Sequence, residues 1–266
     1  MKGLKIILLV VAFFTNQLLS SQNATENSKI VKVLSFNILH GATTKNDFNL
    51  DVIAKVIIDA APDFVALQEV DFKTNRAKKY DLVTELGYRT KMSPIFAKAM
   101  DYDTGEYGEG VLSKYTFLQT RNVGLPYKPN DEPRAALEVI TVLRSKDTIA
   151  FIGTHLDHLK DETNRIMQAK KINTSFLSNK YPTILAGDLN AEPNSETIKI
   201  LEKKWTGAYN KKNPKPTFSS ENPSKKIDYV MFYPKKRWKV LKTKVIQDKI
   251  ASDHCAYLVT LQLLDE

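Results

Sequence analysis

Short apolar runs bounded by polar or turn-forming residues recur along the chain and predict strands. The first covers residues 30–36 and ends at Asn37, and the second covers residues 64–67 and ends in Gln68-Glu69. Short continuous runs of this kind between turn signals are typical of buried strands. The same pattern predicts further strands at residues 111–113, 116–122, 135–143, 148–153, 184–186, 227–232 and 256–263.

Apolar residues at helical spacing separate these strand groups. After Asn49, whose side chain suits a helix N-terminus, apolar residues follow at i, i+3, i+4, i+7 and i+8, and Pro62 ends the segment. Further helices are expected at residues 80–86, stopped by Gly87, at 163–177 and at 195–201. Each predicted helix therefore stands alone between strands.

The element order favours an α+β fold. Strands outnumber helices, and this pattern is typical of two sheets packed face to face with helices outside. Residues 100–110, rich in glycine, aspartate and tyrosine, and the Pro- and Ser-containing segment 213–224 are interpreted as loops. No divider appears after residue 28, so residues 30–266 are expected to form one domain, preceded by a polar linker at 23–29.

Residues 1–22 have the pattern of a secretory signal peptide. Lys2 and Lys5 precede a short apolar run that ends at Phe14. That run is too short to span a bilayer, which needs about 20 residues. The alternative is an uncleaved membrane anchor extending to Leu19, which the polar Thr15-Asn16-Gln17 interruption disfavours. We therefore expect export to the periplasm or the cell exterior.

Charge and cysteine content narrow the class of partner. The formal net charge of +9 favours anionic partners, such as a phosphoester substrate, nucleic acid or a phospholipid headgroup. The lysines are scattered, which favours a solvated basic surface over a dedicated nucleic-acid groove. Cys255 is the single cysteine, so an intrachain disulfide is impossible, and we expect it to be a buried small residue. No obligate protein partner is evident, and a monomer is expected.

Polar side chains of one character stand at the termini of the predicted strands. A single such residue is as well explained by turn chemistry, because Asx residues are common there. Several together are poorly explained that way, since buried polar groups are costly unless they bind something. Their amide, carboxylate and imidazole groups suit a hard cation and a phosphate. These positions are Asn37, Glu69, His155, Asp188 with Asn190, Asp228, and Asp253 with His254.

The motifs around these residues resemble, in order, those of the endonuclease/exonuclease/phosphatase superfamily, the deoxyribonuclease-I-like group. They are Ser35-Phe36-Asn37, Leu67-Gln68-Glu69, Gly153-Thr154-His155-Leu156, Gly187-Asp188-Leu189-Asn190, Ile227-Asp228-Tyr229 and Ser252-Asp253-His254. The resemblance covers essentially residues 30–263. It implies a four-layered α/β/β/α sandwich of two mixed sheets with outer helices. It also implies hydrolysis of phosphoester bonds with Mg²⁺ or Mn²⁺.

The resemblance implies a role for each site residue. Glu69 is the expected principal metal ligand, with Asn37 and Asp253 completing or supporting the metal site. These are oxygen ligands, as a hard cation requires. A zinc site is disfavoured because cysteine ligands are lacking.

The remaining roles concern water and phosphate. Asp188 is expected to orient and deprotonate the attacking water, and Asn190 to hydrogen-bond a phosphoryl oxygen. His155 and His254 are expected to bind the phosphate and stabilise its developing charge. The expected role of Asp228 is to fix the tautomer of His254.

Flanking residues resemble supporting parts of the family site. Arg134 is expected near the scissile phosphate, the alternative being an exposed edge-strand arginine. Asp157 and Arg165 are expected to support the loop after His155 without touching substrate, and His158 to lie at the surface. Glu109 departs from the family pattern, and we expect it to repel polyanions or to help hold a second cation.

Three functions stay open from the sequence. The first is an exported Mg²⁺- or Mn²⁺-dependent phosphodiesterase or phosphatase that acts by in-line attack of an activated water. The second is a secreted nuclease, for which Tyr102, Tyr107, Tyr127 and Trp205 could stack bases, although such residues more often pack. The third is a catalytically silent binding protein on the same fold. A sphingomyelinase-like function is disfavoured because no exposed Trp-Phe hairpin is evident.

Overall fold

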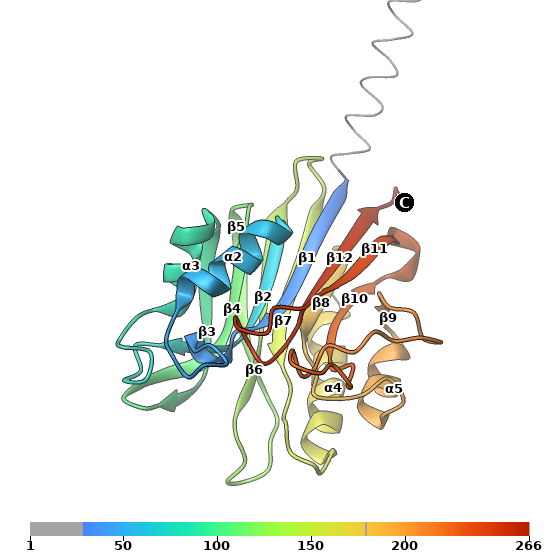
Figure 1. The fold of residues 1–266 in the computed structure, drawn as a ribbon. Helices are drawn as coiled ribbons and strands as arrows, with labels where there is room; N and C mark the ends of the chain where they lie inside the picture. The colour runs from blue at the N-terminus through green and yellow to red at the C-terminus, as the bar shows by residue number, and fades with distance from the viewer. Residues whose placement is uncertain (1–28, 179, 266) are drawn as a thin grey trace, which may run out of the picture.

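The computed structural model describes residues 29–178 and 180–265, which fold into two six-stranded sheets packed face to face (Figure 1). Both sheets are mixed: β1 pairs parallel with β2 and β7 pairs parallel with β8, and the remaining neighbours are antiparallel. The predicted α+β sandwich of two mixed sheets is therefore confirmed. The predicted signal peptide and the linker up to residue 28 lie outside the described residues.

The first sheet has the order β11-β12-β1-β2-β4-β3. Its strands are β1 (Ile30–Asn37), β2 (Phe64–Phe72), β3 (Ser93–Tyr102), β4 (Gly105–Ser113), β11 (Trp238–Ile246) and β12 (Ala256–Leu263). The second sheet has the order β5-β6-β7-β8-β10-β9. Its strands are β5 (Phe117–Leu125), β6 (Arg134–Val142), β7 (Thr148–His155), β8 (Thr183–Asp188), β9 (Thr206–Gly207) and β10 (Asp228–Tyr233).

Helices cover the outer face of each sheet, two on each side (Figure 1). The helices α2 (Leu50–Ala60) and α3 (Leu82–Thr90) pack on the first sheet. The helices α4 (Thr163–Phe176) and α5 (Glu196–Glu202) pack on the second. Two short 3-10 turns, η1 (Leu39–Gly41) and η2 (Lys235–Arg237), complete the described elements. No helix within the described ranges is long and apolar enough to cross a membrane.

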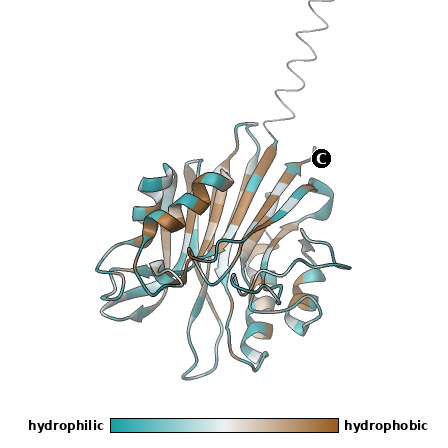
Figure 2. Cartoon of the chain, in the orientation of Figure 1, coloured by the Kyte–Doolittle hydropathy of each residue, from teal (hydrophilic) through white to brown (hydrophobic). Residues whose placement is uncertain are grey.

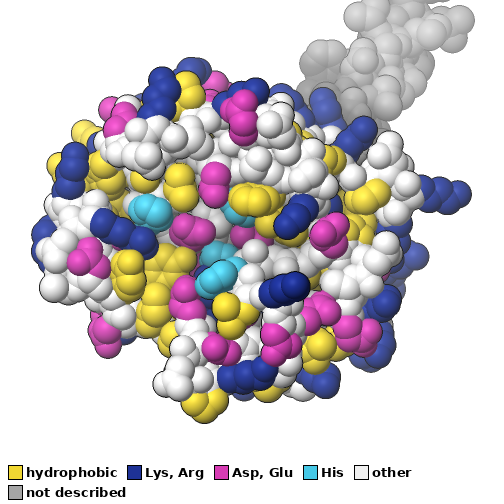
Figure 3. All heavy atoms as spheres, turned by 60° about the horizontal axis from the view of Figure 1, so that its bottom comes forward, with side chains coloured by type: hydrophobic (Ala, Val, Ile, Leu, Met, Phe, Trp, Pro, Cys, Tyr) yellow, Lys and Arg dark blue, Asp and Glu magenta, His cyan; other side chains and the backbone are white. Residues whose placement is uncertain are grey.

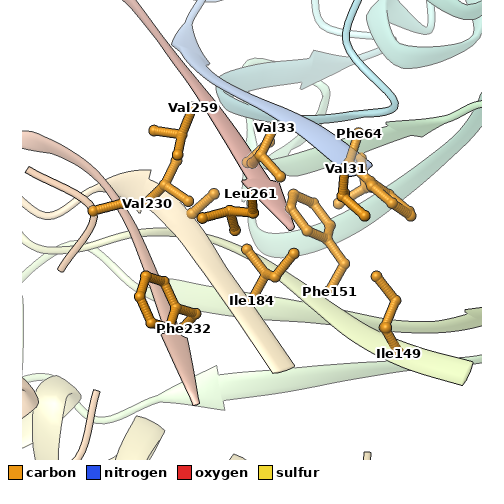
Figure 4. Close-up of a cluster of buried hydrophobic side chains, with 14 of the residues drawn as sticks. Val31, Val33, Phe64, Ile149, Phe151, Ile184, Val230, Phe232, Val259 and Leu261 are labelled. Carbon is orange, nitrogen blue, oxygen red and sulfur yellow. The ribbon is translucent and has the colours of Figure 1, made fainter. Parts of the chain in front are cut away.

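Three apolar clusters hold these layers together. One lies between each pair of helices and its sheet, and the third fills the space between the sheets. In this central cluster the rings of Phe64 and Phe151 stack at a centroid distance of 5.0 Å, one from each sheet (Figure 4). Figure 2 shows the hydrophobic positions along the strands and the hydrophilic loops at their ends. Because burial of apolar area drives folding, this central layer fixes how the two sheets meet.

Several helix ends follow local sequence signals. The Asn49 side chain accepts from the backbone N–H groups of Asp51 and Val52 and so caps α2 as predicted. The prediction that Gly87 ends α3 was wrong. Gly87 lies inside the helix, packed against Pro94, and the left-handed residue that ends the helix is Lys91.

Two strand predictions are corrected by the structure. The segment 100–110, expected as a loop, belongs mainly to the β3–β4 hairpin, because its residues pair across a tight turn. Strand β2 does not end at Glu69 but continues to Phe72, since a register shift between Leu67 and Val70 bulges the strand at that point. Edge strand β11 was not predicted.

Candidate active site

A cavity of about 790 Å³ opens where the ends of the two sheets meet. All four histidines of the chain line it, together with Glu69, Arg134, Asp188, Asn190 and Asp253. Figure 3 shows these imidazoles, in cyan, among carboxylates at the centre of one face of the molecule. The structure thus brings together strand ends that are far apart in the sequence.

Asp188 stands at the centre of the cavity floor. Its Oδ2 lies 3.5 Å from Nε2 of both His155 and His254, and 3.4 Å from the Asn37 amide nitrogen. Burial raises the pKa of Asp188 above its usual range, although the charge of His254 opposes this shift. The carboxylate is therefore a stronger base than an exposed aspartate.

Close packing of β7 against β8 sets the position of Asp188. The two strands are parallel, with Thr154 opposite Gly187 and His155 opposite Asp188. A Cβ atom at Gly187 would lie 2.0 Å from the carbonyl oxygen of Thr154. Only glycine permits this approach, so the main chain itself holds the carboxylate beside the imidazole.

His155 is neutral because its ring is buried and because a guanidinium lies against its Nδ1. The Arg134 guanidinium, which can only donate, places Nη1 2.7 Å from that atom, and we therefore assign the imidazole proton to Nε2, beside Asp188 and the Asn190 amide. Burial, and then the charge of Arg134, hold the pKa of His155 well below its usual value. Arg134 is itself buried, which rules out the alternative of a solvent-facing arginine.

His254 is in the opposite state. Its Nδ1 lies 3.2 and 3.1 Å from the two carboxylate oxygens of Asp228. Burial disfavours the cation, but the carboxylates of Asp228 and Asp188 outweigh it and raise the pKa of His254 to about 10. His254 is therefore an imidazolium at neutral pH, and its Nε2–H points toward Asp188.

Asn190 follows β8 in a left-handed conformation, with φ of 47°. Its backbone N–H donates to Asp188 Oδ1 at 2.9 Å, and its amide nitrogen lies 3.0 Å from Nε2 of His155. Glu69 also has a positive φ, 56°, at the bulge of β2. Non-glycine residues in this region are uncommon and cluster at functional sites, where surrounding contacts hold them.

Glu69 forms the second carboxylate centre, on the first sheet. The Asn37 amide donates to its Oε1 at 3.0 Å, and Nδ1 of His40 lies 3.5 Å from its Oε2. Burial would raise the pKa of Glu69, but His40, His155 and Asn37 together lower it to about 2. Glu69 is therefore ionised throughout the physiological range and faces the cavity.

Asp253 also lines the cavity, and its pKa is raised by burial and, despite His254, by the negative charge of Glu69. The negative charge of Glu69 raises the proton affinity of Asp253, and a divalent cation would relieve this repulsion. A second group, Asp188, Asp228 and His254, has ligand atoms within 4.8 Å of one another. Its Asp228 oxygens are already committed to His254, so we favour Glu69, Asp253 and Asn37 as the metal-holding set.

Asp157 and Arg165 lie beside the loop that follows His155. The Asp157 carboxylate accepts from the backbone N–H of Leu159 at 2.8 Å and from the Asn164 amide at 3.1 Å. Arg165 donates to the carbonyl oxygens of Asp157 and Leu159. Both side chains are buried and hold the loop in place.

Glu109 does not line the cavity, contrary to the expectation that it repels polyanions there. Its side chain is fully buried below the site, and neither carboxylate oxygen has a hydrogen-bond partner among the described residues. Burial raises the pKa of Glu109 well above its usual range, opposed by the charge of Arg134. Arg134 Nε likewise lacks a partner.

Further residues reach the cavity without any signal in the sequence. Glu132 lies 3.1 Å from Arg134, and His158, exposed as expected, places Nδ1 3.1 Å from the same guanidinium. Arg76 comes from the loop after β2, and His40 comes from the 3-10 turn η1. Only the short distance from Asn37 to His40 along the chain could have suggested one of them.

This chain is similar to a known protein family in sequence and to several solved structures in fold. A profile of the endonuclease/exonuclease/phosphatase family matches residues 34–254. A structure of an endonuclease/exonuclease/phosphatase from Beutenbergia cavernae is 21% identical, covering 88% of this chain and 72% of that one, with a TM-score of 0.75. A mannosyl-6-phosphatase from Bacteroides thetaiotaomicron is 16% identical, with coverages of 87% and 99% and a TM-score of 0.71. The human Nocturnin catalytic domain is 18% identical, with coverages of 89% and 95% and a TM-score of 0.71. At these identities the structural likeness shows the fold alone.

Proposed function

Because the chain belongs to the endonuclease/exonuclease/phosphatase family, whose members are hydrolases of phosphoester bonds, we propose that it is a Mg²⁺- or Mn²⁺-dependent phosphodiesterase or phosphatase. One observation carries this proposal. A buried carboxylate, Asp188, stands between a neutral imidazole and a cationic one, 3.5 Å from each. Titratable groups whose environments push their proton affinities apart are characteristic of acid–base catalysis.

The proposed reaction is in-line attack of water on phosphorus. Asp188 orients the water and accepts its proton. The His254 imidazolium donates a hydrogen bond to a phosphoryl oxygen, as do neutral His155 through Nε2–H and the Asn190 amide. Asp228 keeps the imidazolium charged and correctly turned.

A divalent cation would be held by Glu69, with Asn37 and Asp253 completing its protein ligands. When bound, it supplies charge stabilisation for the phosphoryl oxygens and the departing alkoxide. Glu69 contributes a carboxylate that stays ionised, and Asn37 holds its Oε1 in position at 3.0 Å.

The charges of the cavity disfavour a nuclease. The chain as a whole has a net charge of +9, but the cavity is lined by six carboxylates against five lysines and arginines and the His254 imidazolium, so the cavity has no excess positive charge. Binding of single strands depends on a positively charged groove that follows the backbone. A compact phosphoester therefore fits this cavity better than a polynucleotide.

We further propose that the protein is exported, on the pattern of residues 1–22 alone. The charged n-region and the short apolar run support this step. N-terminal sequencing of the protein recovered outside the cytoplasm would detect cleavage near residue 22. Recovery of the intact N-terminus in the cytoplasm would contradict export.

Turnover of small phosphoesters tests the catalytic proposal. The full chain is assayed with p-nitrophenyl phosphate and bis-p-nitrophenyl phosphate in Mg²⁺, in Mn²⁺ and with excess EDTA. Loss of the general base should lower kcat by about 10³-fold in Asp188→Asn, within the range for such groups. Asp59→Asn, an exposed aspartate on α2, serves as the matched control and should match wild type. Equal, negligible turnover by wild type and Asp188→Asn with both metals would refute the proposal.

A further inference from the structure

One wall of the cavity takes no part in the chemistry proposed above. It is formed by Arg76, Met100, Tyr102 and Tyr107, here called the Arg76 wall. Arg76 comes from the loop after β2, and the other three come from the β3–β4 hairpin of the same sheet. All four therefore lie on the sheet that carries Glu69, whereas Asp188 belongs to the opposite sheet.

The position of the Arg76 wall relative to Asp188 determines which part of a substrate contacts it. In an in-line displacement the departing group leaves from the side opposite the attacking water. Because Asp188 of the second sheet activates that water, the departing alcohol lies toward the first sheet. The Arg76 wall is thus placed to contact the non-phosphate part of the substrate.

Arg76 is held rigidly in this wall. Its Nε and Nη2 donate to the two oxygens of the buried Asp71 at 2.7 and 2.8 Å. The guanidinium carbon lies 4.5 Å from the Tyr102 ring centroid and 5.7 Å from that of Tyr107. Asp71 compensates the positive charge, so Arg76 offers directed N–H donors, chiefly from Nη1, and little net charge.

A compensated acceptor lines the same cavity as this donor. Glu132 also lines the cavity, and its Oε1 is 3.1 Å from Arg134 Nη2. The adjoining Lys98 is likewise paired, with Asp101 and Glu106. Among the described residues of this wall, no cation lacks a carboxylate partner, so a second phosphate or a polyanion would find no free positive charge here.

We propose that the Arg76 wall, with Glu132, binds an uncharged ring bearing several hydroxyl groups, such as a sugar or cyclitol, as the departing alcohol of a phosphoester. Fixed donors, a fixed acceptor and aromatic surface are the few convergent polar groups and apolar faces that orient such a ring. This inference rests on the proposed phosphoesterase function and names its substrate class.

Comparison of departing groups tests the inference. Phosphate release by the full chain with Mg²⁺ is measured on glucose 6-phosphate, inositol 1-phosphate, fructose 1,6-bisphosphate and ethyl phosphate. Cleavage of a short DNA oligonucleotide is followed by gel electrophoresis, because a cleaved diester releases no free phosphate. We expect kcat/KM for the two ring monoesters to exceed that for ethyl phosphate and for the bisphosphate by about 100-fold, as several oriented contacts allow.

Two variants of the wall should reduce that preference. Tyr102→Leu removes a partly exposed ring, and Arg76→Lys keeps the charge beside Asp71 but loses the fork of donors. Each should lower the ratio of ring monoester to ethyl phosphate about tenfold, through KM more than kcat. Tyr88→Leu, a highly exposed tyrosine on α3, is the matched control and should leave the ratio unchanged.

The outcomes separate the two proposals. If ethyl phosphate or the oligonucleotide is hydrolysed as well as the ring monoesters, or if both variants keep the wild-type ratio, the substrate class is wrong while the phosphoesterase function stands. If wild type hydrolyses none of these compounds and no p-nitrophenyl ester, the proposed function fails and the substrate class with it.

Discussion

The two histidine environments of the cavity differ although both imidazoles face the same carboxylate oxygen. Each Nε2 lies 3.5 Å from Asp188 Oδ2. The difference arises on the other ring nitrogen: Arg134 donates to Nδ1 of His155, whereas Asp228 accepts from Nδ1 of His254. Burial lowers the pKa of both rings, and the residue behind each ring adds to that effect at His155 and opposes it at His254.

This asymmetry matters for a phosphoryl-transfer site. A phosphate between two imidazolium ions would be bound tightly in the ground state, which does not by itself speed the chemical step. With one cationic and one neutral imidazole, the phosphate can accept a hydrogen bond from each ring but meets a positive charge on only one side. Removing Asp228 should lower the pKa of His254, whereas removing Arg134 should raise the pKa of His155, and either change should reduce the asymmetry.

The largest effect is expected from Asp228→Asn. The carboxylate that holds His254 as a cation is lost, so the pKa of His254 should fall from about 10 toward its ordinary value. We expect kcat to fall by about 10³-fold, as happens when a buried carboxylate behind a catalytic histidine is replaced. The alkaline limb of the pH–rate profile should also move to lower pH.

Nuclear magnetic resonance titration of the four histidine rings separates this effect from unfolding. Asp265→Asn, near the end of β12 and far from the cavity, is the matched control. An unchanged His254 titration in folded Asp228→Asn would show that the cationic state has another origin.

A smaller loss is expected from Arg134→Gln, which alters the neutral half. Removal of the positive charge beside Nδ1 should raise the pKa of His155, although burial, which is the larger cause, and the charge of His254 still lower it. We expect kcat/KM to fall by about 100-fold, comparable to the loss of one preorganised donor.

The position of the His155 titration is the decisive measurement here. If its pKa falls or stays fixed in Arg134→Gln, the guanidinium is not what keeps the ring neutral. Arg144→Gln, on the turn after β6, provides the arginine control.

The smallest effect is on the stability of the metal-free protein. His254 has a folded-state pKa of about 10, above the value near 6.5 of an unfolded chain, so the folded state binds more protons. Its contribution is complete below about pH 6.5 and is lost as pH rises through 10. We expect this loss, about 1.4 kcal/mol for each pH unit, to be largely offset in the wild type by Lys226, whose pKa burial lowers to about 7 so that folding releases its proton.

Denaturant unfolding at several pH values measures this slope. In Asp228→Asn the His254 contribution should be absent, so above pH 7 stability should rise with pH and not stay nearly level, because Lys226 then acts alone. A slope of the same size in both proteins would assign the dependence to other groups.

The sequence predicted much of the fold because the apolar pattern reflects burial. Most strands that line the central core, such as β7 and β12, were found from that pattern, and α2 was found with its Asn49 cap. Strand β11 was missed because Lys239, Lys242 and Lys244 interrupt it, as suits an exposed edge strand. The β3–β4 hairpin was missed because glycine and aspartate there form a tight turn and not a long loop.

The sequence predicted only those residues of the candidate site that stand at strand ends. Asn37, Asp188 and His254 carry that signal, and the structure gathers them around one cavity. Arg76 and Glu132 carry none, because their role depends on contacts with Asp71 and Arg134 that no local pattern reveals. The residues proposed to select a substrate are thus less visible in the sequence than those proposed to act on phosphate.

The close approach at Gly187 also limits how this enzyme could change over evolution. A single added methyl group would collide with the carbonyl oxygen of Thr154 and push β7 and β8 apart. The displaced strands carry His155 and Asp188 at adjacent positions, so the acid–base pair would separate although neither residue had been altered. The smallest side chain in the protein is therefore under the same selective constraint as the charged groups it holds in register.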